Sequence, residues 1–228
     1  MQWEGDERAV RVAAGPVVLE GNLSLPEDAR GIVLFAHGSG SSRLSSRNRH
    51  VARLLNQANL ATLLVDLLTS EEEAVDLRTA HLRFDIGLLA ERLVGVTDWL
   101  TQAPETRQLR IGYFGASTGA GAALVAAAER SETVGAVVSR GGRPDLAGSA
   151  LTRVRAPTLL IIGGNDVQVI ALNRAALAQL RCVKQLVIVP GATHLFEEPG
   201  ALDQVAQLAR DWFDRYLTRE EVPTARAK

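Results

Sequence analysis

The chain has 228 residues, of which 46% are hydrophobic and 22% charged, a composition that supports a sizeable core and disfavours wholesale disorder. Its formal net charge of −1 argues against a dedicated nucleic-acid binder, which normally carries a basic excess. The single cysteine, Cys182, cannot form an internal disulfide and cannot supply a thiolate metal cluster.

The start of the chain is polar and acidic and lacks the features of a secretory signal. No uninterrupted apolar run reaches the roughly 18–20 residues that are needed to cross a bilayer. We therefore expect a soluble, cytoplasmic protein that engages neither a membrane nor nucleic acid. The sequence leaves the oligomeric state open between a monomer and a homodimer.

The first two apolar segments predict an antiparallel hairpin at the edge of a sheet. Residues 10–13 and 17–25 alternate between polar and apolar side chains, which is typical of strands with one exposed face. Gly15 and Pro16 stand between them and favour a turn.

The rest of the chain alternates short apolar runs with longer helical patterns, which indicates βα units around a parallel sheet. The predicted strands cover residues 31–37, 61–66, 109–114, 134–139, 156–162 and 185–189. The predicted helices cover residues 44–58, 86–100, 117–129, 169–180 and 201–217, with one helical turn within 140–155. Residues 67–83 are predicted as a polar, acidic connection, in which Glu71, Glu72 and Glu73 start a solvated helix and do not bind metal.

No repeat, low-complexity linker or shift in composition marks a second domain. The sequence therefore predicts one α/β domain over residues 1–228, with about eight strands and five or six helices. Residues 218–228 are charged and are predicted to form a frayed tail.

The segment Gly115-Ala116-Ser117-Thr118-Gly119 carries the pattern Gly-x-Ser-x-Gly between a predicted strand and a predicted helix. This is the context in which the pattern indicates a nucleophile elbow. The serine occupies a strained, tight turn, so the residues two before and two after it must have almost no side chain. The elbow presents the Ser117 hydroxyl at the carboxyl end of the sheet, above a helix N-terminus.

A serine nucleophile needs a base and a group that orients the base. His194 follows the last predicted strand, and Asp166 follows the strand that ends at Ile162. The chain order Ser117, Asp166, His194 is that of the α/β-hydrolase arrangement. An alternative role for Asp166 is to cap the helix that begins near Val169.

The loop after the first buried strand, His37-Gly38-Ser39-Gly40, is rich in small residues. Such a loop can aim a backbone N–H at the oxyanion that forms during acyl transfer, and we assign the donors to Ser39 and Thr118. His37 is expected to brace the loop. A phosphate cradle is the rival interpretation, but the sequence lacks a Gly-x-x-x-x-Gly-Lys-Ser/Thr motif.

Together these motifs resemble the α/β-hydrolase superfamily, and more narrowly its dienelactone-hydrolase-like branch. The motifs that carry the resemblance are His37-Gly38-Ser39-Gly40, Gly115-Ala116-Ser117-Thr118-Gly119, Gly164-Asn165-Asp166 with Val169, and Gly191-Ala192-Thr193-His194. The resemblance implies an eight-stranded, mostly parallel sheet and ester hydrolysis through an acyl-enzyme. Dienelactone hydrolases proper use a cysteine nucleophile, whereas the elbow here holds Ser117.

Many enzymes of this superfamily insert a lid between the strands that end here at Ser139 and begin at Ala156. The link over residues 140–155 is too short for a cap domain, so we expect an open site. Arg43 and Arg140 follow strand ends near this site and could grip an acidic substrate through bidentate guanidinium contacts. The alternative is that these arginines are ordinary solvated surface residues.

The sequence thus predicts a serine hydrolase for carboxylic esters or lactones that needs no cofactor and no metal. The alternatives are acyl transfer or amide and peptide cleavage by the same triad, and a non-catalytic ligand-binding module on a hydrolase fold.

Overall fold

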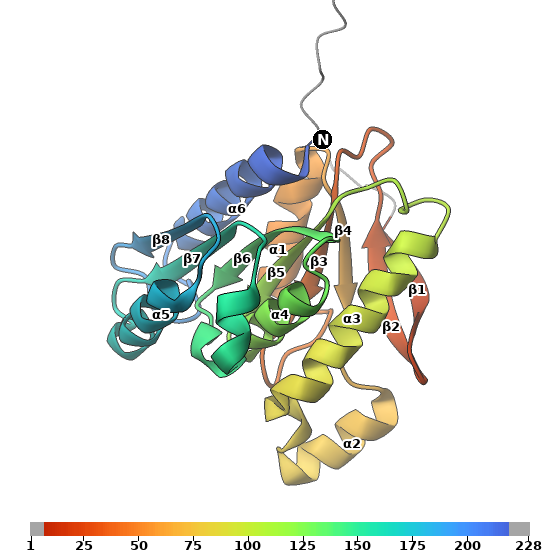
Figure 1. The fold of residues 1–228 in the computed structure, drawn as a ribbon, viewed down its shortest axis with the longest axis horizontal. Helices are drawn as coiled ribbons and strands as arrows, with labels where there is room; N and C mark the ends of the chain where they lie inside the picture. The colour runs from red at the N-terminus through yellow and green to blue at the C-terminus, as the bar shows by residue number, and fades with distance from the viewer. Residues whose placement is uncertain (1–6, 219–228) are drawn as a thin grey trace, which may run out of the picture.

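The apolar runs of the sequence form one sheet in the computed structural model, which describes residues 7–218 (Figure 1). Its eight strands are β1 (Glu7–Ala14), β2 (Val17–Ser24), β3 (Ile32–Ala36), β4 (Ala61–Val65), β5 (Ile111–Ala116), β6 (Val134–Arg140), β7 (Thr158–Gly163) and β8 (Lys184–Val189). Their order across the sheet is β1-β2-β4-β3-β5-β6-β7-β8. The predicted α/β class is confirmed.

The sheet is parallel except at one edge. β1 and β2 pair antiparallel through a turn at Gly15, whose φ of 62° is the left-handed conformation that glycine adopts most easily. β2 then pairs antiparallel with β4, and every later neighbour is parallel. The predicted N-terminal edge hairpin is therefore correct.

Helices cover both faces of the sheet. They are α1 (Ser46–Gln57), α2 (Ser70–Thr79), α3 (Ile86–Gln102), α4 (Thr118–Glu129), α5 (Val167–Gln179) and α6 (Ala201–Leu217), with 3-10 helices η1 (Leu82–Phe84) and η2 (Pro144–Arg153). α1 and α6 lie behind the sheet in Figure 1, and α3, α4 and α5 lie in front of it. Because both faces are covered, all residues of β3, β4, β5 and β7 are buried.

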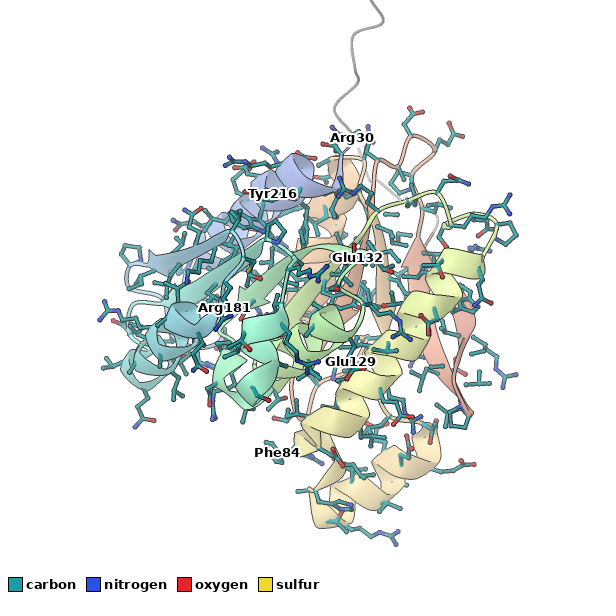
Figure 2. All side chains as sticks on the ribbon, viewed as in Figure 1. Arg30, Phe84, Glu129, Glu132, Arg181 and Tyr216 are labelled. Atoms are coloured by element: carbon teal, nitrogen blue, oxygen red, sulfur yellow. The ribbon has the colours of Figure 1, made fainter. Side chains whose placement is uncertain are left out.

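The segment predicted as a polar connection over 67–83 contains the whole of α2, which stands apart at the lower edge in Figure 1. A capping box begins this helix, because Thr69 accepts from the Glu72 amide and Glu72 accepts from the Thr69 amide. Asp76 is its one buried residue, so the segment has no apolar stripe from which periodicity could have predicted its length. Phe84, labelled in Figure 2, follows in η1 and is 56% exposed.

The link between β6 and β7 contains η2 and no inserted domain, in agreement with the expected absence of a cap. Within residues 7–218 no helix is both long and apolar enough to cross a membrane. All but the first residue of the predicted tail over 218–228 lies outside the described part of the chain.

Candidate active site

Ser117 sits in the strained turn between β5 and α4. Its φ of 50° and ψ of −123° are rare for a residue with a side chain. The flanking glycines make this turn possible. A Cβ on Gly119 would collide with the carbonyl oxygens of Ala36 and His37, and one on Gly115 would collide with the backbone of Ala120. The local geometry is that of a nucleophile elbow.

Asp166 and His194 lie together at the same edge of the sheet, directly beyond β7 and β8. Asp166 Oδ2 is 2.6 Å from His194 Nδ1, and the aspartate side chain is largely buried, with 15% exposed. The Asp166 backbone stands at the N-cap position of α5, but its side chain makes no capping hydrogen bond. The carboxylate therefore serves the histidine and not the helix.

The loops that carry these two residues are packed against each other through their backbones. A Cβ on Gly163 would collide with the carbonyl oxygens of Ala192 and Thr193, so only glycine permits this approach. Asn165 joins the loops further, because its backbone amide donates to Ala192 O and its side-chain amide donates to Gly191 O, both at 2.9 Å. The Asp166–His194 geometry is thus set by backbone contacts.

The segment over residues 140–143 lies between the elbow and the histidine. Ser117 N–H donates to the Arg140 carbonyl at 3.4 Å, and Arg143 N–H donates to the Ser117 carbonyl at 2.9 Å. A Cβ on Gly141 would come within 3.5 Å of His194 Nδ1. The fully buried Asn173 of α5 donates to the Gly142 carbonyl at 2.9 Å and holds the segment in place. Sequence reasoning missed Asn173, because nothing in a helical pattern distinguishes it from a surface polar residue.

The loop after β3 approaches the elbow closely. A Cβ on Gly38 would lie 2.9 Å from Ser117 Cβ, so this glycine lets the loop backbone reach the nucleophile. Ser39 N–H donates to the Thr118 hydroxyl oxygen at 2.9 Å. Thr118 begins α4, and its own N–H has no acceptor within the helix. The structure thus brings Ser39 and Thr118 together, and the Ser39 amide already has a side-chain partner.

His37 links the same loop to the end of β4. Its Nε2 accepts from Leu67 N–H at 3.1 Å, and its Nδ1 lies 3.0 Å from the Gly38 carbonyl. Burial lowers the pKa of His37 below its ordinary value. A neutral ring with both nitrogens engaged braces the loop, as expected, and does not act as a base.

The cysteine and two of the other histidines have partners other than Ser117. Cys182 follows α5 and lies 3.7 Å from the Thr158 hydroxyl, at the start of β7 and so at the opposite edge of the sheet. His50 pairs with the exposed Asp203, and His81 pairs with Thr79. None of these three contacts involves Ser117.

The two arginines singled out in the sequence have different environments. Arg43 is engaged within the protein: its amide donates to Asp66 Oδ1 at 2.6 Å, and its guanidinium binds the same carboxylate and Asn22 Oδ1. Arg140 is buried at the end of β6 and makes no ion pair among the described residues. Arg43 is therefore held by a carboxylate of the protein, whereas Nε and Nη1 of Arg140 have no hydrogen-bond partner.

A cavity of about 320 Å³ lies between the loop after β3 and α2. Its wall combines loop atoms with apolar and charged side chains, namely His37, Gly38, Ser39, Gly40, Ser41, Ser42, Asp66, Leu68, Glu73, Asp76, Leu77, Arg83 and Leu89. Ser117, Asp166 and His194 are not among the residues that line it. Across residues 7–218 no group of three or more His, Cys, Asp or Glu side chains could hold a metal ion.

The sheet order, the elbow after β5 and the paired acid and histidine after β7 and β8 define an α/β-hydrolase fold. The model of the dienelactone hydrolase family matches residues 19–218. A dienelactone hydrolase from Anabaena variabilis is 71% identical, with a TM-score of 0.92 over 93% of this chain and 98% of that one. The chain belongs to the dienelactone hydrolase family.

Two further comparisons concern a more distant solved structure and two longer relatives. Est1E from Butyrivibrio proteoclasticus shares the fold at 16% identity, with a TM-score of 0.75 over 91% of this chain and 98% of that one. Proteins of two Mycobacterium tuberculosis strains, provisionally named phosphoribosyl transferases, are 61% identical over 211 residues. The match covers 92% of this chain and 47% of theirs, so the chain spans about half the length of these relatives.

Proposed function

We propose that the chain is a serine hydrolase that cleaves carboxylic esters or lactones through an acyl-enzyme. The hydrogen bond of 2.6 Å between Asp166 and His194 carries this proposal, together with the strained elbow at Ser117. A carboxylate at Nδ1 selects the tautomer in which Nδ1 bears the proton, and this leaves the Nε2 lone pair available as a base.

In the proposed reaction Ser117 Oγ attacks the carbonyl carbon and gives its proton to His194 Nε2. The carbonyl oxygen becomes an oxyanion, for which the amides of Thr118 and Ser39 are the proposed donors. The intermediate then collapses, and the leaving alcohol takes the proton from His194 Nε2. A water molecule activated by the same histidine hydrolyses the ester of Ser117 and restores the hydroxyl.

The Ser39 amide can serve the oxyanion only if it shares or exchanges its present acceptor. Its hydrogen bond to the Thr118 hydroxyl holds the loop against the first turn of α4. We propose that this contact positions the Ser39 amide beside the Thr118 amide, and that the oxyanion then competes with the neutral hydroxyl for it. A charged acceptor wins such a competition because charge-assisted hydrogen bonds are about twice as strong as neutral ones.

The same triad would support acyl transfer or amide cleavage, which differ from ester hydrolysis only in the acceptor or the leaving group. Phosphoribosyl transfer is the activity in the name of the Mycobacterium relatives, which have about twice the length of this chain. We do not extend that activity to this chain, because a strained serine elbow with an Asp–His pair is machinery for acyl chemistry.

The first test is hydrolysis of p-nitrophenyl pentanoate by the wild type and by Ser117→Ala, with fluorophosphonate labelling of both. We expect a loss of about 10⁵- to 10⁶-fold in kcat and loss of the label in the variant. Ser149→Ala, at an exposed serine of η2, and Cys182→Ala are the matched controls and should keep both. Labelling that survives in Ser117→Ala but disappears in Cys182→Ala would overturn the assignment of the nucleophile.

A further inference from the structure

A hollowed surface lies at the edge of the sheet where the strands β5 to β8 begin. Two hollows of about 540 and 550 Å³ adjoin each other there, since Ser131 and Arg155 line both. The starts of β5 and β6 border the first hollow, and the residues just before β8 border the second. Ser117, Asp166 and His194 all follow the ends of strands, so this surface lies at the opposite edge from the candidate triad.

The charges that line the two hollows are almost all positive. Five arginines and one glutamate line them, although the whole chain carries a net charge of −1. The arginines are Arg107, Arg110, Arg153, Arg155 and Arg181. Glu132 lines the first hollow and Arg181 lines the second, and both are labelled in Figure 2. Positive charge is thus concentrated on this surface and offset by acidic residues elsewhere in the chain.

Most of these arginines are not bound by the protein itself. Arg155 pairs with Glu132, and both side chains are exposed. The other four arginine side chains make no ion pair and no hydrogen bond with any residue in 7–218. Arg110 lies along the start of β6, where its Nε would be 3.6 Å from a Cβ on Gly135. Their N–H groups therefore remain available to a ligand, in the fixed fork of a guanidinium.

Helix ends offer another role for cations at this edge, because the free carbonyl groups of a last turn attract positive charge. Lys184 has this role, since its Nζ donates to the Leu177 carbonyl at 2.7 Å and the Leu180 carbonyl at 2.6 Å, at the end of α5. The four unpaired arginines donate to no helix carbonyl in the part of the chain that the structure describes. Helix capping therefore does not explain them.

The walls of the hollows favour a compact anion with several charges. The hydroxyl-bearing residues Thr101, Ser131, Thr133 and Thr152 line them beside the arginines. Among the described residues no aromatic side chain lines either hollow, so nothing there would stack on a nucleobase. Guanidinium forks bind two phosphate oxygens at a time, and a phosphate group carries more charge than a carboxylate. Each hollow has the volume of a small-molecule site, and a ligand that reaches both needs at least two anionic groups.

We propose that these five arginines form a binding site for a compact molecule that carries two or more phosphate groups. Arg155, which borders both hollows, would contact the ligand between its two ends. The site and Ser117 lie at opposite edges of the sheet. The inference therefore does not rest on the proposed hydrolase function, and its test needs no turnover.

Isothermal titration calorimetry of the wild type with inorganic triphosphate measures this binding directly. We expect one triphosphate to bind per chain and orthophosphate to bind more weakly, because it offers a single group. The Kd for triphosphate should rise with added salt, since salt screens exposed charges. Ser117→Ala should bind triphosphate as the wild type does.

The arginines are tested by Arg110→Ala/Arg155→Ala, which removes one guanidinium from the first hollow and the one that both hollows share. We expect the Kd for triphosphate to rise by about 10- to 100-fold, because charge-assisted hydrogen bonds are lost. Arg78→Ala/Arg174→Ala is the matched control. It removes the same charge from two exposed arginines outside the hollows and should leave the Kd nearly unchanged.

Glu132→Gln should change the affinity in the opposite direction. Glu132 is the single carboxylate among the described residues that line the hollows, and it competes with the ligand for Arg155. Its neutralisation should lower the Kd by about 2- to 5-fold, the size of effect expected for an exposed ion pair. A gain in affinity cannot arise from a variant that fails to fold.

Three results would overturn the site. They are a wild type that does not bind triphosphate, equal losses of affinity in the two double variants, and stronger binding of decaglutamate than of triphosphate. The second result would show attraction by overall charge alone, and the third would identify a docking surface for an acidic protein segment. A wild type that binds triphosphate but does not hydrolyse p-nitrophenyl pentanoate would refute the hydrolase and retain this site.

Discussion

Two regions near Ser117 differ in how completely their polar groups are paired. In the first, the loops after β7 and β8 bind each other through Asn165, and Asp166 holds His194. In the second, the end of β6 and the first turn of α1 leave guanidinium nitrogens of Arg140 and Arg47 buried without hydrogen-bond partners.

The difference in hydrogen-bond pairing suits the two regions to different roles. A paired, backbone-packed region can hold a base in one orientation before the substrate arrives, which is what proton transfer requires. Buried donors without partners destabilise the free protein, because they have lost water without gaining a hydrogen bond. A ligand that supplies the missing acceptors removes this cost when it binds. The Asp166–His194 region is held by paired contacts, whereas the arginine region keeps buried donors without partners.

The sharpest test of the preorganised side is Asp166→Asn. We expect kcat to fall by about 10⁴-fold, because an amide favours the wrong tautomer of His194 while the geometry persists. Asp203→Asn is a matched control, since Asp203 also pairs with a histidine, His50, but on the exposed surface. Initial rates with p-nitrophenyl pentanoate measure both. A similar loss in the two variants would show that the Asp166 contact has no special role.

The packing of the two loops is tested by Gly163→Ala. The added methyl group would collide with the carbonyl oxygens of Ala192 and Thr193, so the loops must separate. We expect the free energy of unfolding to fall by about 1–3 kcal/mol, measured by urea denaturation, and hydrolysis to fall with it. Gly87→Ala places a methyl group in ordinary contact within α3 and should leave both nearly unchanged. A stable, active Gly163→Ala would contradict the close packing.

The contact between the oxyanion loop and α4 is tested by Thr118→Val, which keeps the shape and removes the hydroxyl acceptor. With the Ser39 amide no longer positioned, we expect kcat to fall by about 10-fold at nearly constant KM. Thr118→Ser restores the hydroxyl and should recover most of the rate. An increase of kcat in Thr118→Val would show instead that the hydroxyl only competes with the oxyanion.

The smallest expected effect concerns Glu198, which accepts from Thr193 N–H at 3.0 Å and supports the histidine loop. Its hydrogen bond with Thr193 lowers the pKa of the Glu198 carboxyl. A lowered pKa in the folded state means that the contribution to stability is present above the ordinary glutamate pKa. It is lost as the pH falls through the folded-state pKa. The wild type should therefore be slightly more stable than Glu198→Gln at neutral pH, and the difference should shrink on acidification. Thermal melts across this pH range measure it, and a difference that grows in acid would contradict the assignment.

Much of the site could be located from the sequence because a parallel sheet collects the carboxyl ends of its strands at one edge. Ser117, Asp166 and His194 each follow a strand that the apolar pattern predicts, and the structure places all three at that edge. The glycines of the elbow could also be predicted from the sequence, because the turn excludes side chains at Gly115 and Gly119.

The parts that sequence reasoning missed depend on partners far along the chain. Arg43 and Arg140 both follow strand ends in the sequence, but Asp66 binds the guanidinium of Arg43, whereas Arg140 donates to Asn48 and makes no ion pair within residues 7–218. The start of a helix was predicted at Glu71–Glu73, but the extent of α2 was not, because a capping box and a buried Asp76 define it in place of an apolar stripe.

The sequence by itself determined the order of the strands along the chain, the elbow and the candidate residues at the strand ends, because these depend on short-range patterns of size and polarity. Only the tertiary structure decided which charges are paired, which amide contacts the Thr118 hydroxyl, and which cation stays buried and unpaired. A hydrogen bond or ion pair forms only when two groups from distant segments come within hydrogen-bonding distance, and the local sequence pattern does not determine which groups do so.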